Sequence, residues 1–344
     1  MLAGNGPVFN IGERVEAYTS PLWLALLVLS RVLSFGLVPY EWLAVVLGIT
    51  LSVVGTAALM AGAVALQTPR DGGVPRLWIP FGIVVLLALP PLWDFSSSGL
   101  ENGLAQAWIG LSFAVVARAA AATARRRKVK LPWRFALVGL GPLVRPELGL
   151  YAVGAAVALW LTVVTPRRRA GRSIPSTASL VAAGLAVPVG YEVFRMGYFA
   201  SLVPNTALAK DAGSQRWSRG WNYVTNFATP YRLVVPVVIV VAVVVALRPL
   251  RRPEQRTVAL AFVVPALAHL LYVVVIGGDY MHGRFLLTPL TALIAPLAVL
   301  PVTLVSPARW RAPDVVRVAA AGTVLGVGGG LRRPVAGGAE RPSG

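Results

Sequence analysis

Long apolar runs, separated by short polar or basic segments, constrain this chain more than any other feature. The run Glu41–Leu66 has no charged residue in its interior, and similar runs cover Leu148–Val164, Ser176–Phe194 and Val258–Ile276. A helix that rises about 1.5 Å per residue needs roughly 20 apolar residues to cross a hydrocarbon layer of about 30 Å. Charged residues make up 13% of the chain, well below the roughly 25% of soluble domains. The sequence therefore predicts an all-α fold, a polytopic transmembrane helix bundle.

Further apolar runs raise the expected number of spans to about 9–10, with one additional juxtamembrane outer helix. These runs are Leu22–Leu37, Leu77–Trp93, Asn102–Ala117, Phe135–Val144, Leu233–Leu247, Phe285–Val305 and Val315–Leu325. We divide the chain into a partial outer loop and juxtamembrane helix at residues 1–40, the helical bundle at 41–327 and a glycine-rich, disordered tail at 328–344.

The net charge of +19 comes from basic clusters at the ends of the apolar runs. Such clusters mark cytoplasmic loops, so we expect Arg118–Arg134, Arg167–Arg172 and Arg248–Arg256 to be cytoplasmic and the acidic segments between them to face outward. This distribution argues against a nucleic-acid partner. The chain has no Cys and two His, so it offers no thiolate or His-based metal site. We expect His269 to be a buried, hydrogen-bonded residue within an apolar run.

The opening stretch Gly4–Trp23, GNGPVFNIGERVEAYTSPLW, is polar and leads into the apolar run Leu22–Leu37. Counting spans back from the outward segment at Asp94 places the start of Glu41–Leu66 outside. Arg31 interrupts the run between these two points, and a charge at bilayer depth costs a few kcal/mol. We therefore expect that helix to lie in the outer leaflet without crossing, with the opening stretch outside.

The outward stretch GGDYMHGR, residues 277–284, carries four candidate site residues. Paired glycines allow a tight turn that gathers Asp279, Tyr280, His282 and Arg284 before a helix start. Arg284 and the helix N-terminus suit a phosphate group. The alternative is that Asp279 caps the helix and Arg284 extends to lipid headgroups.

Two further outward stretches carry charges. Arg145-Pro146-Glu147 interrupts a helix, and irregular backbone at membrane depth is tolerated mainly where it lines a cavity; the alternative is an Arg145–Glu147 pair that only locks the break. Glu101 follows the serines of residues 96–98, which fits either a site or a helix cap with an acid in the first turn. Asp94, just before them, is less easily explained as a cap.

The stretch LVPNTALAK, residues 202–210, contributes Asn205 and Lys210. It is followed by three aromatic residues, Trp217, Trp221 and Tyr223. A lysine with aromatic rings suits a sugar-binding platform, and equally an aromatic belt at the membrane interface.

Five of these stretches, in this order, resemble one known family. They are GNGPVFNIGERVEAYTSPLW, SSSGLENGL, LVRPELGLY, LVPNTALAK and GGDYMHGRFLLTP. Together they resemble the actinobacterial arabinofuranosyltransferases with the multi-span GT-C fold, and the similarity runs from about Gly4 to Pro301.

The resemblance implies an inverting glycosyltransferase of the cell membrane. It would transfer a sugar, by analogy arabinofuranose, from a polyprenyl-phosphate donor to a cell-wall glycan on the outer face, with membrane lipid as its surroundings and no cofactor or metal required. The opening stretch matches the second half of the family's first outer loop, which would bring Glu16, Tyr18 and Ser20 to the substrate. The acidic pair that supplies the family's catalytic base would lie before Met1, so we assign no catalytic residue.

Transfer from a lipid phosphate needs cations for the leaving group and polar groups for the sugar. We expect the cations to be Arg145, Lys210, His282 and Arg284, and the sugar-positioning acids to be Asp94, Glu147 and Asp279. The remaining candidate substrate contacts are Glu16, Tyr18, Ser20, Glu101, Asn205 and Tyr280.

Other interpretations stay open at this point. The resemblance implies that either the gene model is truncated at both ends or this copy is inactive. A lipid-sugar flippase or secondary transporter would also need a broken helix and buried charges, but should show a repeat between its halves. A non-catalytic membrane partner protein is the third possibility.

Overall fold

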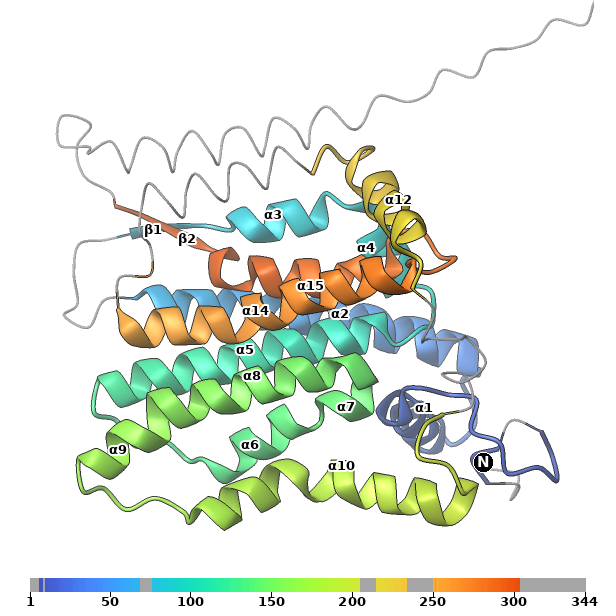
Figure 1. The fold of residues 1–344 in the computed structure, drawn as a ribbon, viewed down its shortest axis with the longest axis horizontal. Coiled ribbons are helices and arrows are strands. Elements are labelled where there is room, and N and C mark those ends of the chain that lie inside the picture. The colour runs from blue at the N-terminus through green and yellow to red at the C-terminus, as the bar shows by residue number, and fades with distance from the viewer. Residues whose placement is uncertain are drawn as a thin grey trace, which may run out of the picture.

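The computed structural model describes residues 6–8, 10–68, 76–204, 215–233, 250 and 252–303 of the 344-residue chain. Within them, five helical segments are long and apolar enough to cross a membrane. They are α2 (Tyr40–Gln67), α5 (Asn102–Ala124), the segment Pro146–Arg169, α10 (Thr177–Phe199) and α14 (Pro253–Ile276). Segment 146–169 is built from η1 (Pro146–Leu148), α8 (Gly149–Leu159), the π-helical turn η2 (Trp160–Val164) and α9 (Thr165–Arg169). The protein is thus an all-α membrane bundle, as the sequence predicts (Figure 1).

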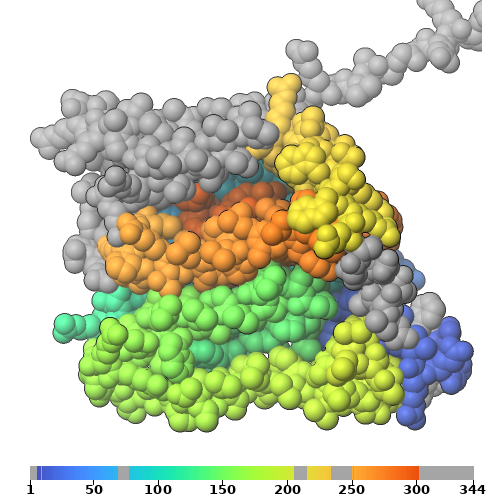
Figure 2. Space-filling view, viewed as in Figure 1, coloured from blue at the N-terminus to red at the C-terminus, as the bar shows by residue number. Residues whose placement is uncertain are grey.

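Shorter elements complete the described fold. They are α1 (Pro21–Leu33), α3 (Phe81–Leu87), α4 (Pro90–Ser96), α6 (Pro132–Gly139), α7 (Gly141–Val144), α12 (Trp217–Ala228), α15 (Arg284–Ile294) and η3 (Ala295–Leu297). Two strands, β1 (Arg76–Ile79) and β2 (Leu300–Thr303), pair antiparallel with Arg76 opposite Thr303. In the space-filling view α14, α8 and α10 cover one face of the bundle, and α12 packs at one end of α14 (Figure 2).

The long helices run beside one another, so their ends form two opposite faces (Figure 1). One end holds the starts of α2 and α5, the break before α8 and the turn between α14 and α15. We call it the acidic end, because every acidic residue of the described chain except Glu254 belongs to these segments, to the N-terminal segment or to neighbouring α4 and α10. The opposite end carries the arginine clusters that follow α5 and form α9.

Glycines hold α2 and α5 in close contact. A Cβ built on Gly110 would lie 2.2 Å from the carbonyl oxygen of Gly55, and one built on Gly103 would lie 2.2 Å from that of Gly48. Close backbone approach of this kind is typical of membrane helices, which associate through small residues rather than through a hydrophobic driving force. The contact fixes α5, and with it Glu101 at its start, against α2.

Two expected elements have a different form. The run Leu77–Trp93 is not one helix but β1, α3 and α4, with Pro80 before α3 and Pro90 at the start of α4. Proline lacks the amide hydrogen and restricts the residue before it, which interrupts a continuous helix. The run Phe285–Val305 likewise divides into α15, η3 and β2. The expected runs Leu233–Leu247 and Val315–Leu325, and the tail 328–344, lie largely or wholly outside the described residues.

Helix α1 has 13 residues, about 20 Å of rise, which is short of a hydrocarbon layer of about 30 Å. The view that shows the long helices from the side shows α1 nearly end-on (Figure 1). Arg31 lies over the ring of Tyr40 at 5.3 Å and donates a hydrogen bond to the carbonyl of Val38. Its guanidinium is therefore held at the turn between α1 and α2, and the juxtamembrane position of α1 stays a prediction.

Candidate functional site

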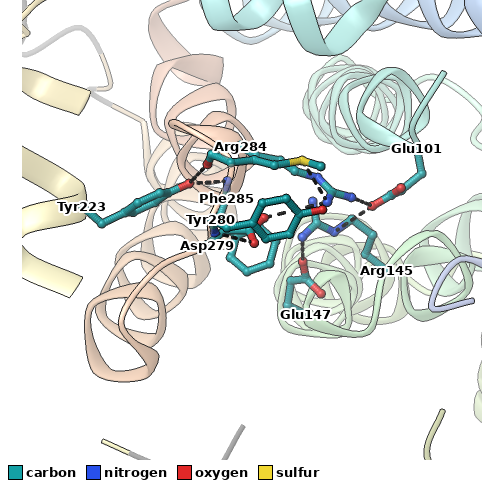
Figure 3. Close-up of polar contacts among 9 residues, drawn as sticks. Glu101, Arg145, Glu147, Tyr223, Asp279, Tyr280, Arg284 and Phe285 are labelled. Carbon is teal, nitrogen blue, oxygen red and sulfur yellow. Dashed lines mark hydrogen bonds and ion pairs between the residues drawn. The ribbon is translucent and has the colours of Figure 1, made fainter. Parts of the chain in front are cut away.

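Five charged residues meet at the acidic end, and we call them the arginine–carboxylate cluster (Figure 3). They are Glu101, Arg145, Glu147, Asp279 and Arg284. Arg284 Nη2 donates to Glu101 Oε1 at 2.7 Å, and Arg145 Nε lies 3.8 Å from the same oxygen. Arg145 Nη2 is 2.6 Å from Glu147 Oε1, and Arg284 Nη1 is 3.8 Å from Asp279 Oδ2. One carboxylate thus bridges two arginines that lie far apart in the sequence, Arg145 between α7 and η1 and Arg284 at the start of α15.

Backbone breaks place these side chains. Glu101 is the residue before α5, and Arg145 has extended backbone, with φ −158° and ψ 142°, between α7 and η1. Asp279 lies in the turn between α14 and α15, and Arg284 is the first residue of α15; Gly277, Gly278 and Gly283 in this turn all have positive φ. At Gly278 a Cβ would also lie 2.4 Å from the ring of Tyr223. Glycine is therefore required there for both conformation and space.

The cluster is largely closed off from solvent. The exposed fractions of its side chains are 6% for Arg145, 11% for Glu101, 12% for Arg284, 5% for Asp279 and 19% for Glu147. Even so, Arg145 Nη1 and Arg284 Nε are buried and have no hydrogen-bond partner among the described residues. Buried polar groups are nearly always hydrogen-bonded, so these two donors point to a polar or anionic ligand.

Helix α12 fastens the turn that carries Arg284. The Tyr223 hydroxyl donates to the carbonyl of Met281 at 2.9 Å and accepts from the amide of Phe285 at 3.2 Å. Burial raises the pKa of Tyr223 to about 12, so the hydroxyl keeps its proton at neutral pH. Arg145 lies over the ring of Phe285, 5.0 Å from its centroid. The sequence analysis left Tyr223 open between a sugar-binding platform and an aromatic belt at the membrane interface, and the structure gives it this supporting contact.

Three further candidates lie around the cluster. Tyr280 is 76% exposed and lies next to Asp279 (Figure 3). His282 is exposed, with its Nε2 3.4 Å from the Tyr231 hydroxyl. Burial, and after it the charge of Asp94, raises the pKa of Tyr231. Tyr231, a residue that the sequence analysis did not single out, is thus influenced by the charge of Asp94 and contacts His282.

Glu16 belongs to a second cluster, between the N-terminal segment and α10. It is fully buried and accepts from the Tyr191 hydroxyl at 2.6 Å and from Arg195 Nε at 2.8 Å. The Tyr18 hydroxyl lies 3.1 Å from that of Tyr191, and burial raises the pKa of Tyr18. Ser20 precedes α1 and is buried, with no partner for its hydroxyl among the described residues. With both its oxygens paired, Glu16 has the contacts of a residue that holds the segment in place.

Tyr191 and Arg195 were not among the sequence-derived candidates. Their spacing of four residues at the end of an apolar run puts both on one helix face, and this could have identified them.

Three positions named in the sequence analysis fall outside the part of the chain that the structure describes. Asn205 and Lys210 are two of them, and Met1, before which the family's acidic pair would lie, is the third. The structure therefore does not test the two substrate contacts, and the position of the catalytic base stays a prediction from the resemblance.

The helix-cap alternatives gain no support from the geometry. Glu101 precedes α5 but makes no side-chain hydrogen bond to the helix start, and its carboxylate pairs with Arg284 instead. Asp279 Oδ1 accepts from the amide of Tyr280, whereas α15 begins only after Gly283. The Arg145–Glu147 pair of the third alternative is present, but Arg145 also approaches Glu101.

His269 lies within α14, outside the cluster. It is buried, with Nδ1 3.1 Å from the Tyr151 hydroxyl. The prediction of a buried, hydrogen-bonded histidine is confirmed.

The described residues contain no group of three or more His, Cys, Asp or Glu side chains that could hold a metal ion. The arginine–carboxylate cluster itself offers two guanidinium groups and three carboxylates, with the aromatic and imidazole groups of neighbouring residues around them.

Similarity to known proteins supports a relationship to one enzyme family. The chain is 40% identical over 326 residues, 88% of its length, to a protein of Mycobacterium tuberculosis named terminal β-(1→2)-arabinofuranosyltransferase. It is 35% identical over 336 residues, 89% of its length, to a protein of the same name from Corynebacterium glutamicum. Over most of its own length the chain is therefore similar to two arabinofuranosyltransferases of actinobacteria. It covers 51% and 46% of these two relatives, so it spans about half their length. No protein-family profile and no solved structure matches it.

Proposed function

We propose that this chain acts as a membrane glycosyltransferase. It transfers an arabinofuranosyl residue from a polyprenyl-phosphate donor to a cell-envelope glycan, and its acidic end is the extracytoplasmic face. The proposal rests above all on the cluster in which Arg145 and Arg284 meet on Glu101, each with a buried nitrogen that has no partner among the described residues. The similarity to two arabinofuranosyltransferases supports the choice of sugar.

In this proposal the two arginines receive the donor phosphate. Guanidinium groups hold phosphate oxygens through charge-assisted hydrogen bonds, and charge that develops on the leaving phosphate is stabilised where donors are already in place. The donor would have to compete with Glu101 for Arg284 Nη2, now 2.7 Å from the carboxylate. Glu147 and Asp279, at the edges of the cluster, are then positioned to accept hydrogen bonds from sugar hydroxyls.

The surroundings fit a lipid-linked donor. The cluster lies where spanning helices α5 and α14 and segment 146–169 reach one end of the bundle. A polyprenyl chain can stay among the apolar helix surfaces while its phosphate reaches that end. Tyr280 and His282, which are exposed beside the cluster, can contact the sugar or the glycan acceptor.

The test is donor binding and transfer by the purified chain in lipid nanodiscs. We expect polyprenyl monophosphate to bind at least about tenfold more tightly than polyprenol with the same tail, because one arginine–phosphate contact contributes about 1.4 kcal/mol or more. Arg284→Gln and Arg145→Gln should each remove most of that preference, and Arg256→Gln, at the opposite end, should keep it.

Transfer is then measured with polyprenyl-phosphoryl-[14C]arabinofuranose and a synthetic oligoarabinofuranoside. We expect a product one residue longer, and its loss in Arg284→Gln with a thermal unfolding midpoint that shows a folded protein. Equal binding of polyprenol and polyprenyl phosphate would refute phosphate recognition. Donor binding without transfer by the unaltered chain would contradict a transferase activity of this chain.

A further inference from the structure

The end of the bundle opposite the arginine–carboxylate cluster carries dense positive charge. Residues 125–134 contain six arginines and lysines and residues 167–172 contain four, with no acidic residue in either segment. We call these segments the basic end loops. They contact each other, because Arg172 Nη1 donates to the carbonyl of Arg126 at 3.3 Å, and Figure 1 shows them at the same end, after α5 and in α9.

One of these arginines, Arg167, is buried, and a second, Arg134, has a buried Nε, and neither has a counter-charge among the described residues. Arg167 is 8% exposed, its Nη1 contacts the carbonyl of Val129 at 3.5 Å, and its Nε has no hydrogen-bond partner among the described residues. The Nε of Arg134 is also buried without a partner in that part of the chain, and burial lowers the pKa of Arg134. Neither side chain forms an ion pair with a described carboxylate. Burying a charge without a partner is costly, so the arrangement suits a bound anion.

A cleft of about 250 Å³ lies beside the basic end loops, between α5, segment 146–169 and the first turns of α14. This is the volume of about eight water molecules, which a segment of an acyl chain can fill. Its walls are largely apolar, with Ala120, Leu161 and Pro166 among them. Thr123 also lines it, and its hydroxyl is buried with no partner among the described residues. A smaller neighbouring pocket shares Ala120 and is lined by Arg125.

We propose that the cleft and the basic end loops form a binding site for an anionic phospholipid. The phosphate lies against the basic end loops, and part of one acyl chain lies in the cleft. Basic pockets between membrane helices recognise anionic headgroups through this combination of charge and apolar surface. Glu254 lines the cleft on the α14 side, which places the phosphate on the side of α5 and α9. The site is separate from the acidic end and does not depend on the proposed activity.

The test is native mass spectrometry of the whole delipidated chain with dioleoylphosphatidylglycerol, dioleoylphosphatidylcholine and glycerol 3-phosphate. The two lipids have the same chains and differ in net charge, and glycerol 3-phosphate carries the anion without chains. We expect one phosphatidylglycerol to bind at least about tenfold more tightly than phosphatidylcholine, since several basic residues near an anionic headgroup act together. Millimolar glycerol 3-phosphate should not displace it.

Two variants separate the contribution of the basic charge to lipid binding from that of the cleft. The exposed triple variant Arg126→Gln/Arg127→Gln/Lys128→Gln should lose most of the preference for phosphatidylglycerol. Its control removes three exposed arginines near the acidic end, Arg216→Gln/Arg219→Gln/Arg232→Gln, and should keep the preference. Ala124→Leu, which fills the cleft, should weaken the binding of both lipids. Equal binding of the two lipids, an unchanged preference in the first triple variant, or displacement by glycerol 3-phosphate would each overturn the proposal.

Discussion

Glu101 is the centre of the arginine–carboxylate cluster, and its neutralisation gives the sharpest test of the described geometry. Glu101→Gln keeps the shape of the side chain but removes the negative charge that offsets the repulsion between Arg145 and Arg284. Breaking a buried ion pair by changing one partner costs roughly 3–5 kcal/mol. Glu147, at 2.6 Å from Arg145, and Asp279, at 3.8 Å from Arg284, still offset part of the positive charge. We therefore expect a loss of about 3 kcal/mol in the free energy of unfolding, at the low end of that range.

A double-mutant cycle isolates the contact. Arg284→Gln alone should also cost about 3 kcal/mol, because it leaves Glu101 with only the longer contact to Arg145 at 3.8 Å. If the two residues act as a pair, the double variant should cost well under the sum, with a coupling of roughly 2 kcal/mol. The measurement is reversible unfolding in mixed micelles, followed by tryptophan fluorescence. The exposed pair Glu13→Gln and Arg256→Gln is the control and should be additive. Additivity within about 0.5 kcal/mol for Glu101 and Arg284 would refute the bridge.

Three other predictions follow from single contacts. Gly110→Ala should lower the free energy of unfolding by about 2 kcal/mol, because its Cβ would lie 2.2 Å from the Gly55 carbonyl and overpacking costs roughly 1–3 kcal/mol. Gly190→Ala, in α10 with nothing within 4 Å of its Cβ, should be neutral or slightly stabilising. An equal effect of the two substitutions would contradict the close glycine contact between α2 and α5. Glu16→Gln should speed tryptic cleavage at exposed Arg14, whereas Glu13→Gln, which loses only a contact to Asn10, should not; equal rates would show that Glu16 does not hold the segment. Tyr223 has a pKa of about 12 in the folded protein against an ordinary 10.0. Its contribution to stability is therefore fully present below about pH 10 and is lost as pH rises through 12. Tyr223→Phe should flatten this part of the stability profile measured by thermal unfolding, and an unchanged profile would assign the titration to another group.

The sequence predicts the helical bundle well, because spanning length and the lack of interior charge are local properties. α2, α5, α10 and α14 each contain an expected run. It does not predict α12, within the polar stretch 195–232, because no continuous apolar run marks it. The signal for this helix is in its spacing, because Gly220, Val224 and Phe227 recur at helical intervals on its inner side.

The site is a different case. The polar residues at the ends of the runs identify Glu101, Arg145, Glu147, Asp279 and Arg284 as candidates, and the structure brings these five together. That Glu101 joins both arginines could not be predicted, because the contact to Arg284 spans 183 positions and depends on how α5 and α15 pack. Glu16 shows the converse, since an acidic residue in a family-like stretch has contacts that hold its own segment rather than contacts to the cluster.

The glycine seam between α2 and α5 also limits which parts of the protein can move. Gly48, Gly55 and Gly62 recur every seven residues on α2, as Gly103 and Gly110 do on α5. A shift of α5 by one residue along α2 would turn these glycines away from the helix contact. Bulkier side chains would then have to fit between two backbones that leave no room for a Cβ, so α5 cannot slide along its axis. A change that separates Arg284 from Glu101 would therefore have to start in the glycine-rich turn between α14 and α15, while Glu101 keeps its place against α2.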